Sequence, residues 1–319
     1  MTATDARSSA PPHSPLRAWL ELLRLPNLAT AWSDILMGFL VTHSGFAPWP
    51  ILLLLLAASS GCYLAGMVLN DVFDLETDRV ERPGRPLPSG RVSRAAALRG
   101  GILLLAGGVT AAWIVAVMVG EWRPGIVATL LAGAVWLYDG PAKRLAIAPL
   151  IMGSCRSLNV LLGMSAAAAP WQPYQGVIAA GLGLYIAGVT WYARTEARPS
   201  NRLRLAFGLG MILLGLGLLA WFPDWVVADG AAANLQLQTT PDRWRLLMAL
   251  LGALIGWRLL WGILEPIPAH VQLGVKQAIL SVIVLDASIT FVFRGFDGAL
   301  PVLVLLIPAM WLGKWIYST

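Results

Sequence analysis

Residues 51–78 read ILLLLLAASSGCYLAGMVLNDVFDLETD, an apolar run followed at once by Asn70, Asp71, Asp74 and Asp78. A helix crosses a lipid bilayer with about 20 mostly apolar residues, within a range of about 17–25. The run Ile51–Leu69 is therefore predicted to span a membrane and to carry a group of carboxylates at one of its ends.

Apolar runs recur along the whole chain. Of its 319 residues, 57% are hydrophobic and only 13% are charged, whereas soluble domains carry about 25% charged residues. None of the runs alternates with a period of two, which argues against strands. We therefore predict an all-α, polytopic transmembrane helix bundle of nine or ten helices. The apolar segments are Leu28–Val41, Ile51–Leu69, Ala95–Val119, Ile126–Leu137, Leu145–Ala169, Gly176–Tyr192, Leu205–Phe222, Leu246–Leu264, Gln277–Phe293 and Ala299–Ile316.

The ends and loops predict the orientation. Residues 1–16 are rich in Ala, Ser and Pro without an apolar run, so we expect a short disordered cytoplasmic tail before a single transmembrane domain, residues 17–319. With the N-terminus inside, the inner loops carry sixteen Lys and Arg and the outer loops four. This positive-inside bias predicts that the N-terminus and the acidic loop are cytoplasmic. We expect an integral protein of the bacterial inner (plasma) membrane. The positive charge is then explained by membrane lipid and phosphate, and no nucleic-acid partner is expected.

The acidic stretch predicts a metal–diphosphate site. If the helix continues through it, Asp71, Asp74 and Asp78 lie on one face. Three carboxylates at a membrane boundary repel one another unless a cation lies among them. Mg²⁺ prefers such oxygen ligands and bridges them to a diphosphate. We therefore expect Mg²⁺ as the cofactor, bound by these three residues. A solvated charged loop is the alternative. The following basic residues, Arg82 and Arg85, are candidate phosphate ligands.

The stretch Asn70-Asp71-x-x-Asp74-x-x-x-Asp78, followed by residues 85–90 (RPLPSG), resembles the first signature of the UbiA superfamily of intramembrane prenyltransferases. Two further short stretches are similar to motifs of that family, namely residues 24–27 (RLPN) and 138–144 (YDGPAKR). The resemblance in motif placement covers about the first 200 residues. The resemblance implies a helical bundle with a central cavity open to lipid. It also implies an isoprenyl diphosphate bound with Mg²⁺ at the cytoplasmic end, whose chain is passed to an unidentified acceptor.

The same resemblance implies roles for individual residues. Asn70 would hold the metal together with Asp71, Asp74 and Asp78. Lys143 and Arg144 would neutralise the leaving diphosphate, and Asn27 and Tyr138 would line the site. The implied catalytic residues are Asp71, Asp74, Tyr138 and Lys143.

One part of the chain departs from the family pattern. After the sixth apolar segment the family carries a second Asp-x-x-x-Asp motif, but residues 192–201 here read YARTEARPSN. Glu196 is the one acid, and Arg194 and Arg198 flank it. Because arginine binds phosphate directly, all three are candidate substrate-binding residues. The change is compatible with retained diphosphate binding, with a phosphorylated acceptor, or with lost catalysis.

The fifth apolar segment contains a second polar group. Arg156 and Asn159 share a helical face, and an arginine in a bilayer requires a partner. They are candidate contacts to phosphate or acceptor. The alternative is a structural arginine paired with Asp34, Asp139 or backbone carbonyls. Residues 156–165 and 192–196 are similar to a divergent subgroup, the EboC-like proteins.

Two functions remain open from the sequence. The first motif favours a Mg²⁺-dependent prenyltransferase. The altered second motif favours a non-catalytic or transport protein that binds a polyprenyl or phosphorylated lipid. An ion-coupled transporter is disfavoured, because the two halves show no matched helix interruptions.

Overall fold

A computed structural model describes residues 15–194, 196, 200–228 and 237–316. Within this part of the chain all regular elements are helical, in agreement with the predicted fold class. The elements are α1 (Pro15–Leu23), η1 (Leu25–Asn27), α2 (Leu28–Thr42), α3 (Trp49–Phe73), α4 (Leu75–Glu81), α5 (Arg94–Val119), α6 (Arg123–Asp139), α7 (Ala148–Met164), α8 (Pro173–Ala193), α9 (Arg202–Ala228), α10 (Pro241–Leu264), α11 (Pro268–Val304) and α12 (Leu306–Ile316).

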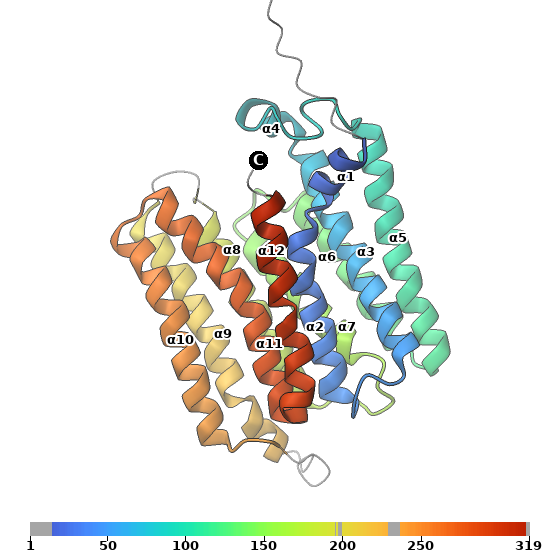
Figure 1. The fold of residues 1–319 in the computed structure, drawn as a ribbon, viewed down its shortest axis with the longest axis vertical. Helices are drawn as coiled ribbons and strands as arrows, with labels where there is room; N and C mark the ends of the chain where they lie inside the picture. The colour runs from blue at the N-terminus through green and yellow to red at the C-terminus, as the bar shows by residue number, and fades with distance from the viewer. Residues whose placement is uncertain (1–14, 195, 197–199, 229–236, 317–319) are drawn as a thin grey trace, which may run out of the picture.

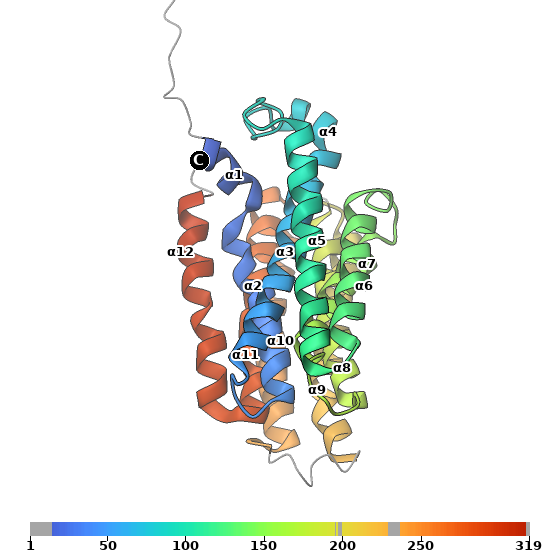
Figure 2. The same cartoon turned by 90° about the vertical axis from the view of Figure 1, so that its right-hand side faces the viewer.

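The long helices pack side by side into a bundle (Figures 1 and 2). Each packs against the next in chain order from α2 through α3 and α5 to α11, and α11 closes the ring by packing against α2. Contacts of α7 with α2 and α3, and of α8 with α11, fill the interior. Helix α12 lies outside the ring, against η1, α2 and α11.

Nine of the ten predicted apolar segments each overlap one helix, and the last, Ala299–Ile316, covers the end of α11 and α12. Six described helices are long and apolar enough to cross a bilayer, which supports an integral membrane protein. The last two segments lie on either side of Gly295, whose φ of 61° and ψ of −156° interrupt α11 and turn the chain back. As a result, α1 and the end of α12 lie at the same end of the bundle (Figure 1). This arrangement fits an even number of membrane-spanning helices. The predicted number of nine or ten stays a prediction.

Small residues allow the helix backbones to approach closely. A side chain at Gly61 of α3 would lie 2.7 Å from the Cα of Gly108 in α5. A side chain at Gly215 of α9 would lie 2.6 Å from the carbonyl oxygen of Gly181 in α8. Close backbone packing of this kind stabilises helix pairs in lipid, where the hydrophobic effect does not hold helices together.

A short amphipathic helix and a loop cover one end of the bundle. Helix α1 begins at Pro15, so the end of the predicted tail, residues 1–16, is already helical. Its Ala18 and Leu22 pack with Val72 of α3 and with Leu87 of the loop after α4. This apolar cluster holds α1, the end of α3 and the loop together around the acidic stretch.

The predicted orientation can be tested by cysteine labelling. Val80 and Asp242 lie at opposite ends of the bundle and are both exposed, by 83% for the whole residue and 92% for the side chain respectively. In a background without native cysteines, a membrane-impermeant thiol reagent should label D242C in intact cells and V80C only after permeabilisation. Labelling in the opposite pattern would place the acidic stretch outside the cell.

Candidate functional site

The acidic stretch lies where α3 ends and α4 begins. The predicted continuous helix is interrupted at Asp74, which has φ −87° and ψ 0°. Its backbone hydrogen bonds nevertheless keep helical spacing. The Asp74 N–H donates to the Asn70 carbonyl at 3.0 Å, and the Asp78 N–H donates to the Asp74 carbonyl at 2.9 Å. Asp71 and Asp78 therefore still meet on one side, and the break changes only the direction of the chain.

Two of the carboxylates share one cation. Arg85 Nη1 lies 2.6 Å from Asp78 Oδ2 and 3.4 Å from Asp71 Oδ1. Arg24 Nη2 lies 2.5 Å from the same Asp71 oxygen. Both carboxylate residues are only 4% exposed. Because a buried carboxylate is costly without a counter-charge, these arginines are what allows the two residues to be buried.

The third carboxylate is paired with another cation. Lys143 Nζ donates to Asp74 Oδ2 and, at 2.5 Å, to Asn70 Oδ1. Tyr138 is half-buried, with Asp74 and Arg194 among its charged neighbours. Lys143, Tyr138 and the acidic stretch are thus brought together, while Arg144 is exposed on the same loop.

Special backbone conformations place the two arginines. Arg24 has φ 47° and ψ 47°, a left-handed conformation between α1 and η1. A residue other than glycine keeps such a conformation only when its surroundings fix it, and the Asp71 ion pair does so. In the loop after α4, Gly90 has φ 74°, and the Ser89 N–H and hydroxyl both donate to the Arg85 carbonyl, at 3.0 and 2.6 Å.

The altered second motif is described only in part. Arg198 lies outside the described residues. Burial raises the pKa of Glu196, and the nearby Arg82 guanidinium opposes that rise. Arg194 is exposed, and its Nη2 donates to the Leu145 carbonyl at 3.0 Å. The charge of Arg82 therefore acts on the second motif, whereas Arg85 forms ion pairs with the first.

The second polar group lies deeper in the bundle. Arg156 Nη1 lies 2.9 Å from Asp34 Oδ2, and the Asn159 amide donates to the same oxygen at 2.8 Å. The Ser59 hydroxyl donates to Asn159 Oδ1 at 2.7 Å. Of the structural partners considered for Arg156, the structure thus selects Asp34. A role of Arg156 and Asn159 in substrate binding stays a prediction.

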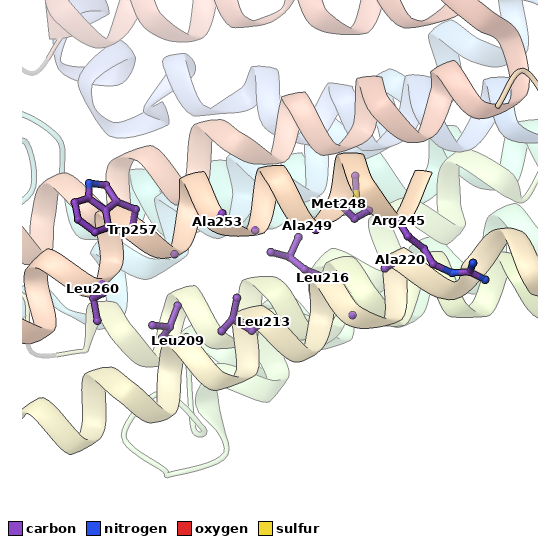
Figure 3. Close-up of a pocket in the computed structure, with 13 residues that line it drawn as sticks. Leu209, Leu213, Leu216, Ala220, Arg245, Met248, Ala249, Ala253, Trp257 and Leu260 are labelled. Atoms are coloured by element: carbon purple, nitrogen blue, oxygen red, sulfur yellow. The ribbon is translucent and has the colours of Figure 1, made fainter. Parts of the chain in front are cut away.

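A separate apolar pocket of about 570 Å³ lies between α9 and α10 (Figure 3). Leu213, Ala253 and Trp257 line it, and Arg245 lies at one end. No residue of the acidic site lines this pocket, so it is not the candidate diphosphate site. The central cavity implied by the family resemblance stays a prediction.

Two residues next to the acidic stretch are not among the predicted site residues. Arg24 contacts Asp71 directly, whereas the sequence predicts a site role only for Asn27 of the same motif. Asp139 lies beside Tyr138, is 4% exposed, and has Lys143 and Asp74 among its charged neighbours. Both residues lie within the two short stretches that resemble the family, and this position in the sequence could have indicated them.

Comparison with known proteins identifies the family. The model of the UbiA prenyltransferase family matches residues 31–263. The chain belongs to the UbiA prenyltransferase family. Whether it belongs to the EboC-like subgroup stays a prediction.

UbiA relatives agree with this membership in sequence and fold. A digeranylgeranylglyceryl phosphate synthase from Sulfolobus acidocaldarius is 38% identical over 98 residues, which cover 30% of this chain and 34% of that protein. A solved structure from work on digeranylgeranylglyceryl phosphate synthase in membranes covers 88% of this chain and 99% of its own, with 20% identity and a TM-score of 0.64. A UbiA homologue from Archaeoglobus fulgidus bound to GPP and Mg²⁺ covers 83% and 99%, with 13% identity and a TM-score of 0.60.

The matched stretch thus spans about a third of the length of the Sulfolobus relative, and the two structures show a shared fold. The activity of this UbiA protein is accordingly inferred from its own site.

The loop that holds Arg85 offers a matched pair of glycine variants. A side chain at Gly84 or Gly90 meets no atom within 4 Å, but only Gly90 has a positive φ. G90A should destabilise the loop by about 1–2 kcal/mol and weaken diphosphate binding, whereas G84A should change neither. Thermal unfolding in detergent and titration with inorganic diphosphate and Mg²⁺ measure both effects. Equal behaviour of the two variants would show that the loop conformation does not position Arg85.

Proposed function

We propose that this UbiA protein is a Mg²⁺-dependent intramembrane prenyltransferase, which moves an isoprenyl chain from an isoprenyl diphosphate to an acceptor lipid. The observation that carries the proposal is the convergence of oxygen donors and cations at one end of the bundle. The carboxylates are Asp71, Asp74 and Asp78, and the cations are Arg24, Arg85 and Lys143.

The charges of these ion pairs explain why metal and diphosphate should bind together. Three carboxylates and three cations balance one another. A diphosphate alone would add several negative charges to a neutral cluster in a partly buried place, which is unfavourable. If divalent cations replace Arg85 and Lys143 at the carboxylates, these side chains become free to donate to phosphate oxygens.

The residues fit Mg²⁺ by their chemistry. Arg85 Nη1 lies between Asp71 and Asp78, and Lys143 Nζ lies between Asn70 and Asp74, so each nitrogen occupies a position shared by two oxygen donors. Among the described residues, no three His, Cys, Asp or Glu side chains are already grouped for a metal. Binding therefore requires both cationic side chains to move. Asn70, Asp71, Asp74 and Asp78 would hold the Mg²⁺, which would supply positive charge to stabilise the leaving diphosphate.

The relatives suggest the class of acceptor. Several of them are named digeranylgeranylglyceryl phosphate synthase, so we take a lipid that bears a glyceryl phosphate as the acceptor. Arg194 beside Glu196 supports this choice, because a cation in place of an acidic motif suits a phosphorylated substrate.

Turnover distinguishes this enzyme from a lipid-binding or transport protein. Purified protein in nanodiscs should be incubated with Mg²⁺ and isoprenyl diphosphates of several chain lengths, with and without geranylgeranylglyceryl phosphate. Acceptor-dependent diphosphate release is expected. Tight binding without release under any condition would favour the lipid-binding alternative.

The first motif can be tested by removing one charge at a time. D71N and D74N should each weaken Mg²⁺-dependent binding of inorganic diphosphate at least about tenfold, because each removes an oxygen charge that would hold the metal. The Glu76 side chain is 77% exposed and forms an ion pair with Arg79, so E76Q serves as the control. Calorimetric titration provides the affinities. Undiminished affinity in both variants would contradict the metal assignment.

Arg194 and Arg202 form a second matched pair. Both are exposed and donate to a backbone carbonyl, of Leu145 and Leu264 respectively. A charged hydrogen bond to phosphate contributes about 1.5–3 kcal/mol, so R194A should weaken phosphate-ligand binding at least about tenfold and R194K should recover part of the loss. R202A should bind like the wild type. Equal binding by R194A and R202A would show that Arg194 does not bind phosphate and contributes only to the positive charge of the inner loops.

A further inference from the structure

Asp139 is a buried acid whose position next to the site has no explanation in the first or second motif. It ends α6, and its residue is 4% exposed. Its Oδ2 atom is fully buried, and no hydrogen-bond partner reaches it within the described part of the chain. An ionised carboxylate in such a place is unfavourable unless a counter-charge joins it.

The unpartnered oxygen lies against the metal-binding face of α3. A Cβ atom built at Gly66 would be 3.6 Å from Asp139 Oδ2. Gly66 precedes Asn70 by one helical turn, so the two positions share a face of the helix. Because Gly66 has no side chain, Val135 and the Asp139 carboxyl group occupy the space one helical turn below Asn70.

The charged surroundings of Asp139 are those of the candidate site. They comprise Lys143 and Arg24, which favour its ionised form, and Asp74 and Asp71, which oppose it. Neither cation forms an ion pair with Asp139 among the described contacts. A divalent cation near Asn70 and Asp74 would join Asp139 to the same positive charge and would relieve its repulsion with Asp74.

We propose that Asp139 is a further oxygen ligand for the divalent cation of the metal–diphosphate complex, supplied by α6 in place of an acid missing from the second motif. The inference rests on the proposed function, because it needs a metal at the first motif. Geometry supports it through the buried Oδ2 atom and its position against Gly66 of α3. The charge of the Asp74 carboxylate acts on the same group. With Glu196 as the one acid between α8 and α9, a carboxylate from another helix restores oxygen ligands to the site.

The test measures metal binding directly. Wild-type protein and variants in nanodiscs are titrated with Mg²⁺, or with Mn²⁺ followed by electron paramagnetic resonance, at saturating inorganic diphosphate. D139N should lower the metal affinity at least tenfold. Asp224 is the matched control because it also has a buried oxygen without a partner, but it pairs with Arg245 away from the acidic site. D224N should bind metal like the wild type.

A second variant covers a folding defect in D139N. G66A keeps the carboxyl group and places a methyl group 3.6 Å from Oδ2 and 3.3 Å from Val135 Cγ1, so the Val135 side chain must shift by a few tenths of an ångström. The variant should also weaken metal binding, because the methyl group keeps the cation away from that oxygen. Wild-type metal affinity in folded D139N, or in G66A where D139N does not fold, overturns the inference. A D139N protein that binds metal normally but transfers prenyl chains slowly also overturns the inference.

The outcomes also separate this inference from the proposed function. If D139N binds metal weakly and the wild type shows no prenyl transfer with any acceptor, Asp139 is a ligand of a non-catalytic site. If the wild type transfers prenyl chains and D139N binds metal normally, the function stands and the inference falls. Absence of diphosphate-dependent metal binding in the wild type overturns both.

Discussion

The ion pairs of Asp71 are the constraint on which this end of the molecule depends. The residue lies in the last turn of a long apolar helix and is almost fully buried, so its charge must be balanced nearby. The balance comes from two segments distant in sequence, through Arg24 before η1 and Arg85 after α4. Both segments adopt special backbone conformations, at Arg24 and Gly90. The fold around the site is thus arranged to bring cations to one carboxylate.

A second layer of charged and polar side chains lies inside the bundle and connects α2 with α7 and α11. Asp34 follows Asn27 by seven residues, about 10 Å along α2, and its partners Arg156 and Asn159 come from α7. Asp286 of α11 accepts from the Ser33 hydroxyl at 2.5 Å. In lipid such contacts between polar side chains help to set helix pairing. Helix α2 therefore connects both layers, since η1 and Arg24 directly precede it.

The sequence predicted helices and charge types well, because apolar length and residue spacing are local properties. The spacing of Asp71 and Asp78 predicts that they share a helical face, and the structure places Arg85 between them. The pairing of Lys143 with Asp74 was not predicted, because it depends on how the loop after α6 meets the end of α3. The helix break at Asp74 was not predicted, since no glycine or proline marks it. The choice of Asp34 as partner of Arg156 depends on how α2 packs against α7. A Cβ built at Gly38 in α2 would lie 3.1 Å from the Cα of Gly163 in α7. Spacing within one helix carries no information about such contacts.

The altered second motif changes how charge is distributed around the site. In this chain Arg82 stands near Glu196, so part of the acidic charge between α8 and α9 is already opposed by the loop after α4. A metal there would have to compete with a guanidinium for one carboxylate, which weakens its hold. On the other side, three carboxylates and an amide remain between α3 and α4, with Asp139 below them. Most carboxylates of the site therefore lie on the side formed by α3, α4 and α6. In the proposed enzyme, Arg82 and Arg194 near Glu196 would bind a phosphate group directly, without a metal between.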